Sequence, residues 1–339
     1  MPELNASMCA VVLVNYKNAG ETLACLESLL GLNTPPAYIL VVDNASGPAS
    51  LNELRAGWST LCAGRGLPAP EIVETAESSP PRFGVLPQEE NLGFAGGNNA
   101  ALAVLLRADC LGFWLLNNDT RVDPAALDRL CATCNAAPNA GICGSTILYA
   151  SSPENLQCAA GGRLCRLTGR TDFILGGARK ESALLADPAT CEAKLDWVLG
   201  CSFFVKREVL EKVGLLPQEY FLYYEDVAFS RLAVKAGFSL HWSPESLVFH
   251  KEGGTTAAKG GGANSGLSRP PIMDYLAVRN RLYLMRTVYP WSLPVAIPGL
   301  AGVFLNRLRR GQADRLPLLL RAAANGLIGN MGRPAGFEQ

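Results

Sequence analysis

The sequence predicts an α/β protein with an open, doubly wound, mostly parallel sheet, helices on both faces and a C-terminal helical extension. Short continuous apolar runs rich in β-branched residues, such as 9–14 and 38–42, are typical of strands buried on both faces. These runs alternate with helical patterns and end in polar turns, which indicates βα units around a parallel sheet. After residue 271 the pattern is helical and amphipathic. We therefore expect a sheet domain followed by helices.

The first two strands should flank an amphipathic helix. Asn18 is a candidate N-cap, and Glu21 follows it three residues later, as in a capping box. The leucines of this segment fall on one helical face: Leu23, Leu26, Leu29 and Leu30. A strand over 38–43 follows, so the opening is a right-handed βαβ unit.

The rest of the first 270 residues continues the alternation. Residues 63–88 are rich in Pro and Gly, which predicts a peripheral region with one short strand among loops. Asp123 before Pro124 predicts a helix start. The other predicted elements are helices over 98–107 and 225–236, strands over 111–116, 197–205, 239–242 and 247–250, and a mobile loop over 253–271.

Composition limits the classes of function. Lys+Arg and Asp+Glu both number 30 in 339 residues, so the chain has no overall basic field to attract nucleic acid. Its 11 cysteines are scattered through predicted strands and helices, which is typical of reduced thiols in a cytoplasmic protein. Cys131 and Cys134 have the spacing of half a zinc site, but no second such pair follows.

Membrane insertion is not expected from the sequence. No basic leader precedes the first apolar run, and the apolar stretch 287–306 contains Pro290, Pro294 and Pro298. We expect a cytoplasmic protein, with peripheral contact on the inner face of the plasma membrane as an alternative.

The turn Asn117-Asn118-Asp119 is the first candidate functional feature. It places a carboxylate and two amides at the end of an apolar strand, and hard oxygen ligands of this kind suit Mg²⁺ or Mn²⁺. A single Asp in a turn is also an ordinary turn former. The turn alone leaves both interpretations open.

Several segments together resemble a known family. In order, they are 14–23, 41–46, 91–99, 116–119, 223–227 and 249–254. In this order they resemble the motifs of family 2 glycosyltransferases, which are inverting enzymes of the GT-A fold, and most of all the rhamnosyltransferase-type members. The resemblance extends over roughly residues 8–290 and is far more specific than any single motif.

The resemblance implies a donor site at the carboxyl edge of the sheet. Asp119 would be the metal ligand, with His250 as a second ligand to Mg²⁺ or Mn²⁺ or a contact to the diphosphate. Asp43 would bind the nucleotide base; read without the family, it only caps the turn that follows its strand. The remaining residues of the implied donor site are Asn15, Tyr16, Asn91, Gly93, Gly96, Gly97, Asn117 and Asn118.

The glycines of this site have two interpretations. In the family they let the backbone approach the nucleotide closely, because glycine has no side chain. As structure alone, Gly96 and Gly97 form a flexible turn before a helix.

The resemblance also implies a catalytic base. Asp226 would remove the proton from the acceptor hydroxyl, and Glu225 would position the acceptor. A first-turn acidic pair also stabilises a helix by itself. His241, inside a strand, is read as structural.

Two residues depart from the family pattern. Ala228 stands where many members have an acidic residue, and Asn117 stands where an Asp is frequent. The first weakens any inference about the acceptor, and the second leaves Asp119 as the sole carboxylate of its turn.

We predict a catalytic domain over 1–270, with a nucleotide-sugar half at about 8–120 and an acceptor half at about 121–270. A C-terminal helical extension over 271–339 would follow and would be the part that contacts a membrane. Within it, Arg279, Asn280 and Arg281 either reach an acceptor phosphate or pack on the core. The arginines that would suit an anionic membrane surface, unless they too pack on the core, are Arg307, Arg309, Arg310 and Arg315.

The predicted function is transfer of a sugar, with rhamnose favoured by resemblance, from a dTDP- or UDP-sugar to a glycan or lipid-linked acceptor in the synthesis of cell-wall or other cell-surface polysaccharide. Two alternatives remain. A sugar-phosphate nucleotidyltransferase would use a similar sheet, although no glycine-rich basic loop lies near the N-terminus. A non-catalytic nucleotide-sugar-binding protein would not need Asp226.

Overall fold

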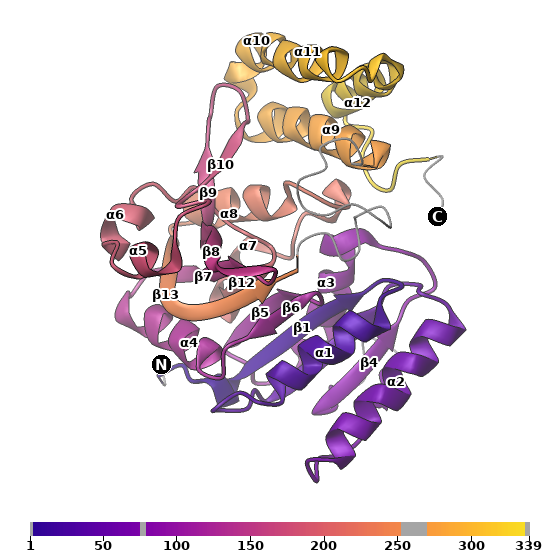
Figure 1. Ribbon diagram of the computed structural model, residues 1–339, viewed down its shortest axis with the longest axis vertical. Helices are drawn as coiled ribbons and strands as arrows, with labels where there is room; N and C mark the ends of the chain where they lie inside the picture. Colours follow the sequence, from indigo (N-terminus) through magenta and orange to yellow (C-terminus); the bar gives the residue numbers. More distant parts are fainter. Residues whose placement is uncertain (1–2, 75–78, 252–269, 336–339) are drawn as a thin grey trace.

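A ten-stranded sheet forms the centre of the computed structural model, which describes residues 3–74, 79–251 and 270–335 (Figure 1). Five strands on one side of the sheet are mutually parallel, in the order β3-β4-β2-β1-β5. They are β1 (Cys9–Asn15), β2 (Tyr38–Asp43), β3 (Glu71–Ile72), β4 (Phe83–Pro87) and β5 (Gly112–Asn117). This half brings the first polar turns to a single edge.

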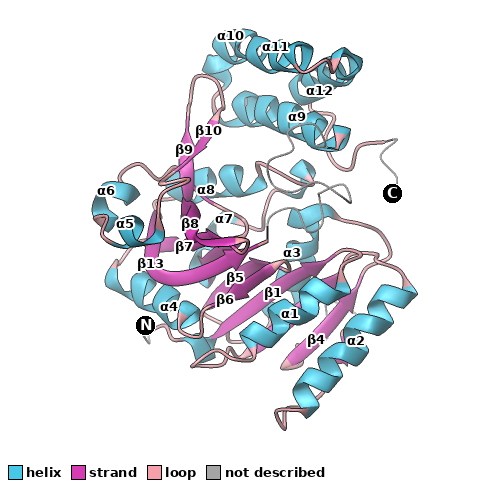
Figure 2. Cartoon of the chain, in the orientation of Figure 1, coloured by secondary structure: helices cyan, strands magenta, loops and turns pink. Residues whose placement is uncertain are grey.

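Both faces of the parallel strands are buried, which explains their continuous apolar sequences. Along β1, Val11 and Leu13 belong to one core and Ala10 and Val12 to another, because successive side chains point to opposite faces. Helices α1 (Ala19–Leu29), α2 (Pro48–Ala63) and α4 (Ala126–Ala136) cover the first face, and α3 (Gly93–Leu105) covers the second (Figure 2).

The other half of the sheet is mixed. Its strands are β6 (Thr120–Val122), β7 (Ala140–Tyr149), β8 (Ser152–Ala159), β12 (Ser202–Lys206) and β13 (Ser239–His250). β12 runs antiparallel between β5 and β7, whereas β13 runs parallel to β7. Helices α7 (Arg207–Val213) and α8 (Glu225–Lys235) belong to this half. The antiparallel β12 joins the two halves at β5.

Smaller elements surround the mixed half. A three-stranded sheet contains β9 (Gly161–Leu164), β10 (Thr171–Phe173) and β11 (Trp197–Val198). The short helices are α5 (Lys180–Leu184) and α6 (Pro188–Glu192), and 3₁₀ turns lie at Ala6–Met8, Gln218–Tyr220, Pro290–Ser292, Pro298–Leu300 and Ala313–Arg315.

The C-terminal helices pack on one another and on the mixed half of the sheet domain (Figure 1). They are α9 (Pro271–Val288), α10 (Leu293–Ala296), α11 (Ala301–Arg309) and α12 (Leu316–Ile328). The buried carboxylate of Asp274 accepts hydrogen bonds from Arg307 at 2.5 Å and Arg315 at 2.7 Å. These two arginines are therefore neutralised inside the extension, which corrects their assignment to a membrane-facing set.

Several element predictions were wrong in detail. β4 lies inside the sheet between β2 and β3, not at the periphery, because Phe83 and Val85 complete the core. α3 begins at Gly93, so Gly96 and Gly97 lie in a helix rather than in a turn before it. Asn18 precedes α1 without a side-chain capping bond. The strand predicted over 197–205 is divided between β11 and β12, and the two predicted over 239–250 are one strand with an irregular register.

The cysteines are all free, and ten of the 11 are buried. Cys9 and Cys131 place their sulfurs 3.7 Å apart inside the core, where Cys131 and Cys134 pack as small apolar residues. No group of three or more potential metal ligands occurs within residues 3–74, 79–251 and 270–335. The half zinc motif is thus part of the hydrophobic core.

None of the helices in the described ranges combines the length and the apolar character that a bilayer-spanning helix requires. The glycine-rich loop predicted over 253–271 lies outside the described residues up to residue 269.

Candidate active site

Three predicted site residues end adjacent parallel strands. Asn15 closes β1 and pairs in register with Asp43 at the end of β2, and Asn117 closes β5 beside Val14. Parallel strands present their carboxyl ends at one edge of the sheet, where ligands of open α/β sheets bind. The sheet topology therefore brings together residues that lie far apart in the sequence.

A buried chain of side-chain hydrogen bonds links this edge to the Asp119 turn. Asn15 Nδ2 donates to Asp43 Oδ1 at 2.7 Å, and Asn15 Oδ1 accepts from Thr22 Oγ1 at 2.8 Å. Thr22 Oγ1 in turn accepts from Asn118 Nδ2 at 2.8 Å. Asn15 and Asn118 therefore orient Asp43 and the turn. Sequence reasoning missed Thr22; its signal was a polar residue on the buried face of α1.

Asp43 also shapes the turn after β2. Its second oxygen accepts from the backbone N–H of Ser46 at 3.2 Å, and the Ser46 hydroxyl accepts from the backbone N–H of Lys17 at 2.8 Å. Tyr16 is half-buried, with the Lys17 ammonium 5.2 Å from its ring centroid. Asp43 therefore caps the turn as the simpler interpretation held, and its role toward a nucleotide base remains a proposal.

The glycines of α3 make close approaches inside the protein. Gly93 has a φ of +72°, and a Cβ there would lie 2.2 Å from the carbonyl oxygen of Phe221. A Cβ on Gly97 would lie 3.0 Å from Val14 of β1, and one on Gly96 would lie 2.8 Å from Leu92. Asn91 Oδ1 accepts from the Gly93 N–H at 2.9 Å and from Asn44 at 3.0 Å. These residues let α3 pack closely against β1 and against the segment at Phe221. Their contact with a nucleotide remains a proposal.

Asp119 and His250 form the candidate metal site. Asp119 Oδ1 lies 3.2 Å from His250 Nε2, and Asn117 Nδ2 lies 3.5 Å from the same nitrogen. His250 Nδ1 lies 2.8 Å from Gln157 Oε1, which can only accept, so this ring nitrogen carries a proton. The ring is thereby held with Nε2 toward Asp119. Gln157, missed from the sequence, is the kind of outer partner that orients a metal-ligating histidine.

Charge around the ring favours a cation there. Burial lowers the pKa of His250, but the neighbouring Cys201 sulfur and the Asp119 carboxylate outweigh it and raise that pKa to about 11. Asp119 Oδ1 and His250 Nε2 are also spaced to bind one divalent cation. Adjacent ligands of an octahedral Mg²⁺ site, each about 2.1 Å from the ion, lie about 3.0 Å apart, close to the 3.2 Å between these atoms. Asp119 and His250 would thus be its side-chain ligands, with further positions left for other oxygens.

The predicted acidic pair opens α8 and is buried. Asp226 accepts hydrogen bonds from the backbone N–H groups of Gly200 at 3.0 Å and Val227 at 2.8 Å. Burial raises the pKa of Asp226 to about 6, against the lowering effect of these hydrogen bonds. Burial and the charge of Asp226 raise the pKa of Glu225 well above its ordinary value. At neutral pH, Asp226 is therefore mostly ionised.

Glu225 has an unused oxygen. Its Oε2 atom is buried and makes no hydrogen bond within the described parts of the chain. Because a buried polar atom without a partner is costly, this oxygen is available to a partner that the described residues do not supply.

Gly200 and Cys201 connect the two groups of candidate residues. Gly200 donates to Asp226, and the carbonyl of Cys201 accepts from the backbone N–H of Asn117 at 2.9 Å. The Cys201 sulfur lies beside His250, as its effect on the histidine pKa shows. The sequence carried no signal for Gly200 and Cys201. They lie between β11 and β12, and only the fold brings that segment beside Asp226 and His250.

The loop before Glu225 is held by the C-terminal helices. Phe221, Tyr223 and Tyr224 all have positive φ, between 68° and 71°, which non-glycine residues rarely adopt. Asn280 Nδ2 donates to the carbonyls of Tyr220 at 3.0 Å, Leu222 at 2.8 Å and Tyr223 at 2.7 Å. The buried Asn280 thus stabilises the conformation that leads into the acidic pair.

The neighbours of Asn280 also bond to backbone. Arg279 donates to Tyr220 O at 3.1 Å, and Arg281 donates to Thr168 O at 2.6 Å. All three residues are buried between helix and core, and contact with an acceptor phosphate remains a proposal. His241 contacts Ser239 at 2.8 Å and Glu192 at 3.1 Å within its own part of the sheet.

Comparison with known proteins adds to this geometry. No family model matches the sequence. The chain is 25% identical over 263 residues to an N-acetylglucosaminyl-diphospho-decaprenol L-rhamnosyltransferase of Mycobacterium tuberculosis, and the match covers 73% of this chain and 76% of the relative. The resemblance to rhamnosyltransferases read from the motifs is confirmed at this level.

Solved structures show the same fold. GalNAc-T7 with UDP, GalNAc and Mn²⁺ superposes with a TM-score of 0.56 at 15% identity over 83% of this chain; the chain covers 48% of that protein, about half its length. The mannosyltransferase PcManGT of Pyrobaculum calidifontis, in complex with GDP-Man and Mn²⁺, superposes with a TM-score of 0.51 at 16% identity, covering 96% of this chain and 90% of that one. Both are GT-A glycosyltransferases, so the predicted fold class is confirmed.

Proposed function

We propose that this chain is a metal-dependent, inverting glycosyltransferase that moves a sugar from a nucleoside diphosphate to a glycan or lipid-linked acceptor. One observation carries the proposal: Gly200 and Cys201 tie the Asp119–His250 pair to Asp226. A cation-binding pair suited to a diphosphate and a base suited to a hydroxyl therefore belong to one connected site. The similarity to a rhamnosyltransferase over 73% of the chain supports it.

The donor would lie along the carboxyl edge of the parallel strands. Asp43, with Asn15 and Tyr16 beside it, would bind the base, and the turn at Asn117 and Asn118 would face the sugar diphosphate. A dTDP- or UDP-sugar is favoured, with rhamnose as the sugar because of the similar rhamnosyltransferase. UDP and GDP-Man are bound in the two similar structures, which supports a nucleoside diphosphate donor.

Asp119 and His250 would hold Mg²⁺ or Mn²⁺, which would offset the negative charge of the diphosphate when bound. Both similar structures contain Mn²⁺, in keeping with this assignment.

Asp226 would act as the base, and Glu225 would position the acceptor. The ionised Asp226 takes the proton of the acceptor hydroxyl as the acceptor oxygen bonds to the anomeric carbon and the bond from that carbon to the diphosphate oxygen breaks. One displacement inverts the anomeric configuration. The free Oε2 of Glu225 would hydrogen-bond to the acceptor and orient it.

The acceptor would be linked to a lipid through a diphosphate, as in the name of the similar rhamnosyltransferase, and the product would serve cell-surface polysaccharide. The C-terminal extension would then lie on the membrane surface. Five of its exposed apolar side chains lie on α10, α11 and the turns beside them, far from the central sheet (Figure 1): Trp291, Val295, Ile297, Leu305 and Leu308. Arg309 and Arg310 on the same segment are exposed and suit anionic lipid.

A panel of UDP, dTDP and GDP tests the donor site by thermal unfolding, with Mn²⁺ or with EDTA. We expect one nucleotide at 100 times its dissociation constant to stabilise the protein by about 2.7 kcal/mol with Mn²⁺. Asp119→Asn should lose this stabilisation, and the control Asp128→Asn, in the first turn of α4, should keep it. The matching nucleotide sugar is then tested for transfer. If no nucleoside diphosphate stabilises the protein with metal, the proposal is wrong.

A further inference from the structure

A cavity of about 560 Å³ lies among α9, α12 and the segment that follows α12. Three arginines line it, Arg279, Arg321 and Arg333, together with Tyr275 and the amide side chains of Asn325 and Asn330. None of its lining residues, all within the described range 270–335, is an aspartate or a glutamate. The cavity is therefore cationic and lined with hydrogen-bond donors.

Arg279 is the buried member of the set, with 1% of its surface exposed. Its guanidinium donates to the carbonyls of Gly332 at 2.7 Å and Tyr220 at 3.1 Å and to the side-chain oxygen of Asn280 at 2.9 Å. These partners satisfy hydrogen bonds but carry no full negative charge. Burial lowers the pKa of Arg279, yet a guanidinium stays protonated in proteins. A buried positive charge is left without a counter-ion among the described residues.

Arg321 brings a second cation to the same aromatic ring. The guanidinium carbons of Arg279 and Arg321 lie 5.5 Å and 5.6 Å from the ring centroid of Tyr275. Arg321 donates to the carbonyl of Ala335 at 3.1 Å. Two like charges are thus held around one ring, which raises the electrostatic energy unless an anion joins them.

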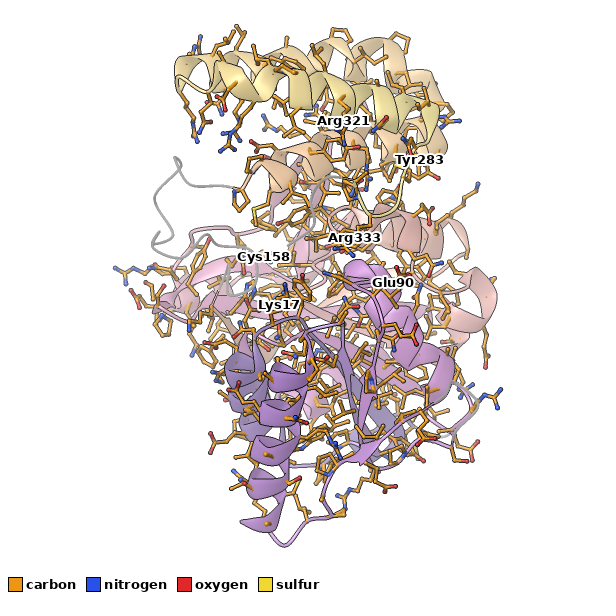
Figure 3. The ribbon with its side chains drawn as sticks, turned by 90° about the vertical axis from the view of Figure 1, so that its right-hand side faces the viewer. Lys17, Glu90, Cys158, Tyr283, Arg321 and Arg333 are labelled. Atoms are coloured by element: carbon orange, nitrogen blue, oxygen red, sulfur yellow. The ribbon has the colours of Figure 1, made fainter. Side chains whose placement is uncertain are left out.

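Arg333 completes the set from the segment after α12. It is exposed and makes no hydrogen bond or ion pair to the residues that the structure describes. Figure 3 shows Arg321 among the C-terminal helices and Arg333 below them, toward the catalytic part of the chain. Its guanidinium is therefore available to a ligand.

Two arginines elsewhere in the same helical extension, one buried and one half-buried, have a carboxylate partner. Arg307 and Arg315 share the carboxylate of Asp274, at 2.5 Å and 2.7 Å. Asp274 thus offsets the charge of these two arginines, whereas the buried Arg281 donates to the carbonyl of Thr168. No carboxylate among the described lining residues offsets the charge of the cavity's arginines in this way.

We infer that this cavity binds a phosphate or diphosphate group. Arginine forks match phosphate oxygens with paired hydrogen bonds. Asn325 Nδ2 donates to the Tyr275 hydroxyl and Asn330 Nδ2 to Asn325 Oδ1, so each amide keeps a second N–H for a ligand. Arg279 also donates to Tyr220, at the start of the loop that leads to Glu225 and Asp226. An anion held here would lie beside the segment that carries the base. Two sources share this chemistry: the diphosphate of a lipid-linked acceptor, and free phosphate or pyrophosphate. The first source rests on the proposed function.

Calorimetric titration of the full chain with inorganic pyrophosphate in EDTA tests the cavity without the metal-dependent donor site. The wild type should bind, and the double variant Arg321→Gln/Arg333→Gln should bind at least about tenfold more weakly, since a charged hydrogen bond contributes about one factor of ten or more. Arg309→Gln, which removes an exposed arginine of α11 outside the cavity, should bind like the wild type. So should Asp119→Asn. Absent wild-type binding, or equal binding by the double variant, would overturn the inference.

Two further arms identify the source of the anion. In the first outcome, farnesyl diphosphate binds more tightly than pyrophosphate and recruits the protein to phosphatidylcholine vesicles, and this recruitment requires Arg321 and Arg333. This outcome assigns the cavity to a lipid headgroup. Equal affinity without recruitment assigns it to the free anion. Manganese-dependent nucleotide binding is measured beside these arms, so failure of the cavity and failure of the proposed function give different results.

Discussion

Asp119 Oδ1 and His250 Nε2 lie 3.2 Å apart, at the ends of two segments 131 residues apart in the sequence. β13 carries His250 along β7 and pairs with β6 just after the turn of Asp119, where His250 is opposite Thr120. The backbone N–H of Lys251 also donates to the carbonyl of Asp119 at 3.0 Å. The pair therefore depends on strand pairing and not on a local motif.

His250→Gln should weaken manganese-dependent binding of the nucleoside diphosphate. Loss of even an outer partner of a metal ligand lowers affinity about tenfold or more, so loss of the ligand itself should do at least this. Calorimetry with Mn²⁺ and with EDTA measures the effect. His241→Gln is the matched control, since His241 lies on the same strand and binds Ser239 and Glu192. Equal loss in both variants would contradict a ligand role for His250.

The transfer rate should fall with acidity below about pH 6. Burial raises the pKa of Asp226 to about 6. The ionised fraction of this base therefore falls as the pH drops through 6, and above that pH the base is mostly ionised. The rate should therefore drop about tenfold per pH unit below 6 and stay level above it. Asp226→Asn should abolish transfer but keep nucleotide binding.

Measuring Glu225→Gln over the same pH range shows which of the two carboxyl groups causes the fall in rate. Glutamine has nearly the size of glutamate, keeps hydrogen-bonding groups and does not titrate, and Asp226 remains in place, so the fall below pH 6 should persist. Disappearance of that fall in Glu225→Gln, or wild-type turnover in Asp226→Asn, would remove Asp226 as the base. A protein that only binds nucleotide sugars would show no transfer in any of these variants.

Asn280→Ala should slow transfer without weakening nucleotide binding. The change leaves the carbonyls of Tyr220, Leu222 and Tyr223 without the amide that holds them, and the loop before Glu225 can then relax from its positive φ values. A buried group left without its partner costs about 1–3 kcal/mol, which denaturant unfolding measures. Asn306→Ala, at an exposed position of α11, is the control. Unchanged turnover and stability would show that Asn280 does not position the loop.

Trp291→Ser combined with Leu305→Ser should weaken binding to anionic vesicles. Both side chains are exposed, 62% and 50%, and each contributes about tenfold to partitioning when it leaves water. Co-sedimentation with vesicles of phosphatidylglycerol and phosphatidylcholine measures this. Leu185→Ser changes an 88% exposed leucine outside the C-terminal helices and should have no effect. Identical sedimentation of all three proteins would rule out this face as the membrane contact.

The sequence predicted the parallel half of the sheet well and the mixed half poorly. β1, β2 and β5 are buried on both faces, so their continuous apolar runs are visible in the sequence. β8 begins with exposed residues and β11 has only two residues, so neither produces a long apolar run. β4 was placed at the periphery because Pro and Gly surround it, although the sheet buries it between β2 and β3.

Residue type and order in the sequence determined the candidate list: Asp43, Asp119, Asp226 and His250 lie at the ends of strands or the start of a helix, where polar side chains stand out against apolar runs. Only the tertiary structure decided what each one contacts. Gln157 faces His250, Gly200 donates to Asp226, and Arg279 is buried beside Arg321, because packing brings distant segments together. Burial then sets the ionisation of Asp226 and Glu225, since the cost of removing a charge from water depends on the surroundings and not on the residue type.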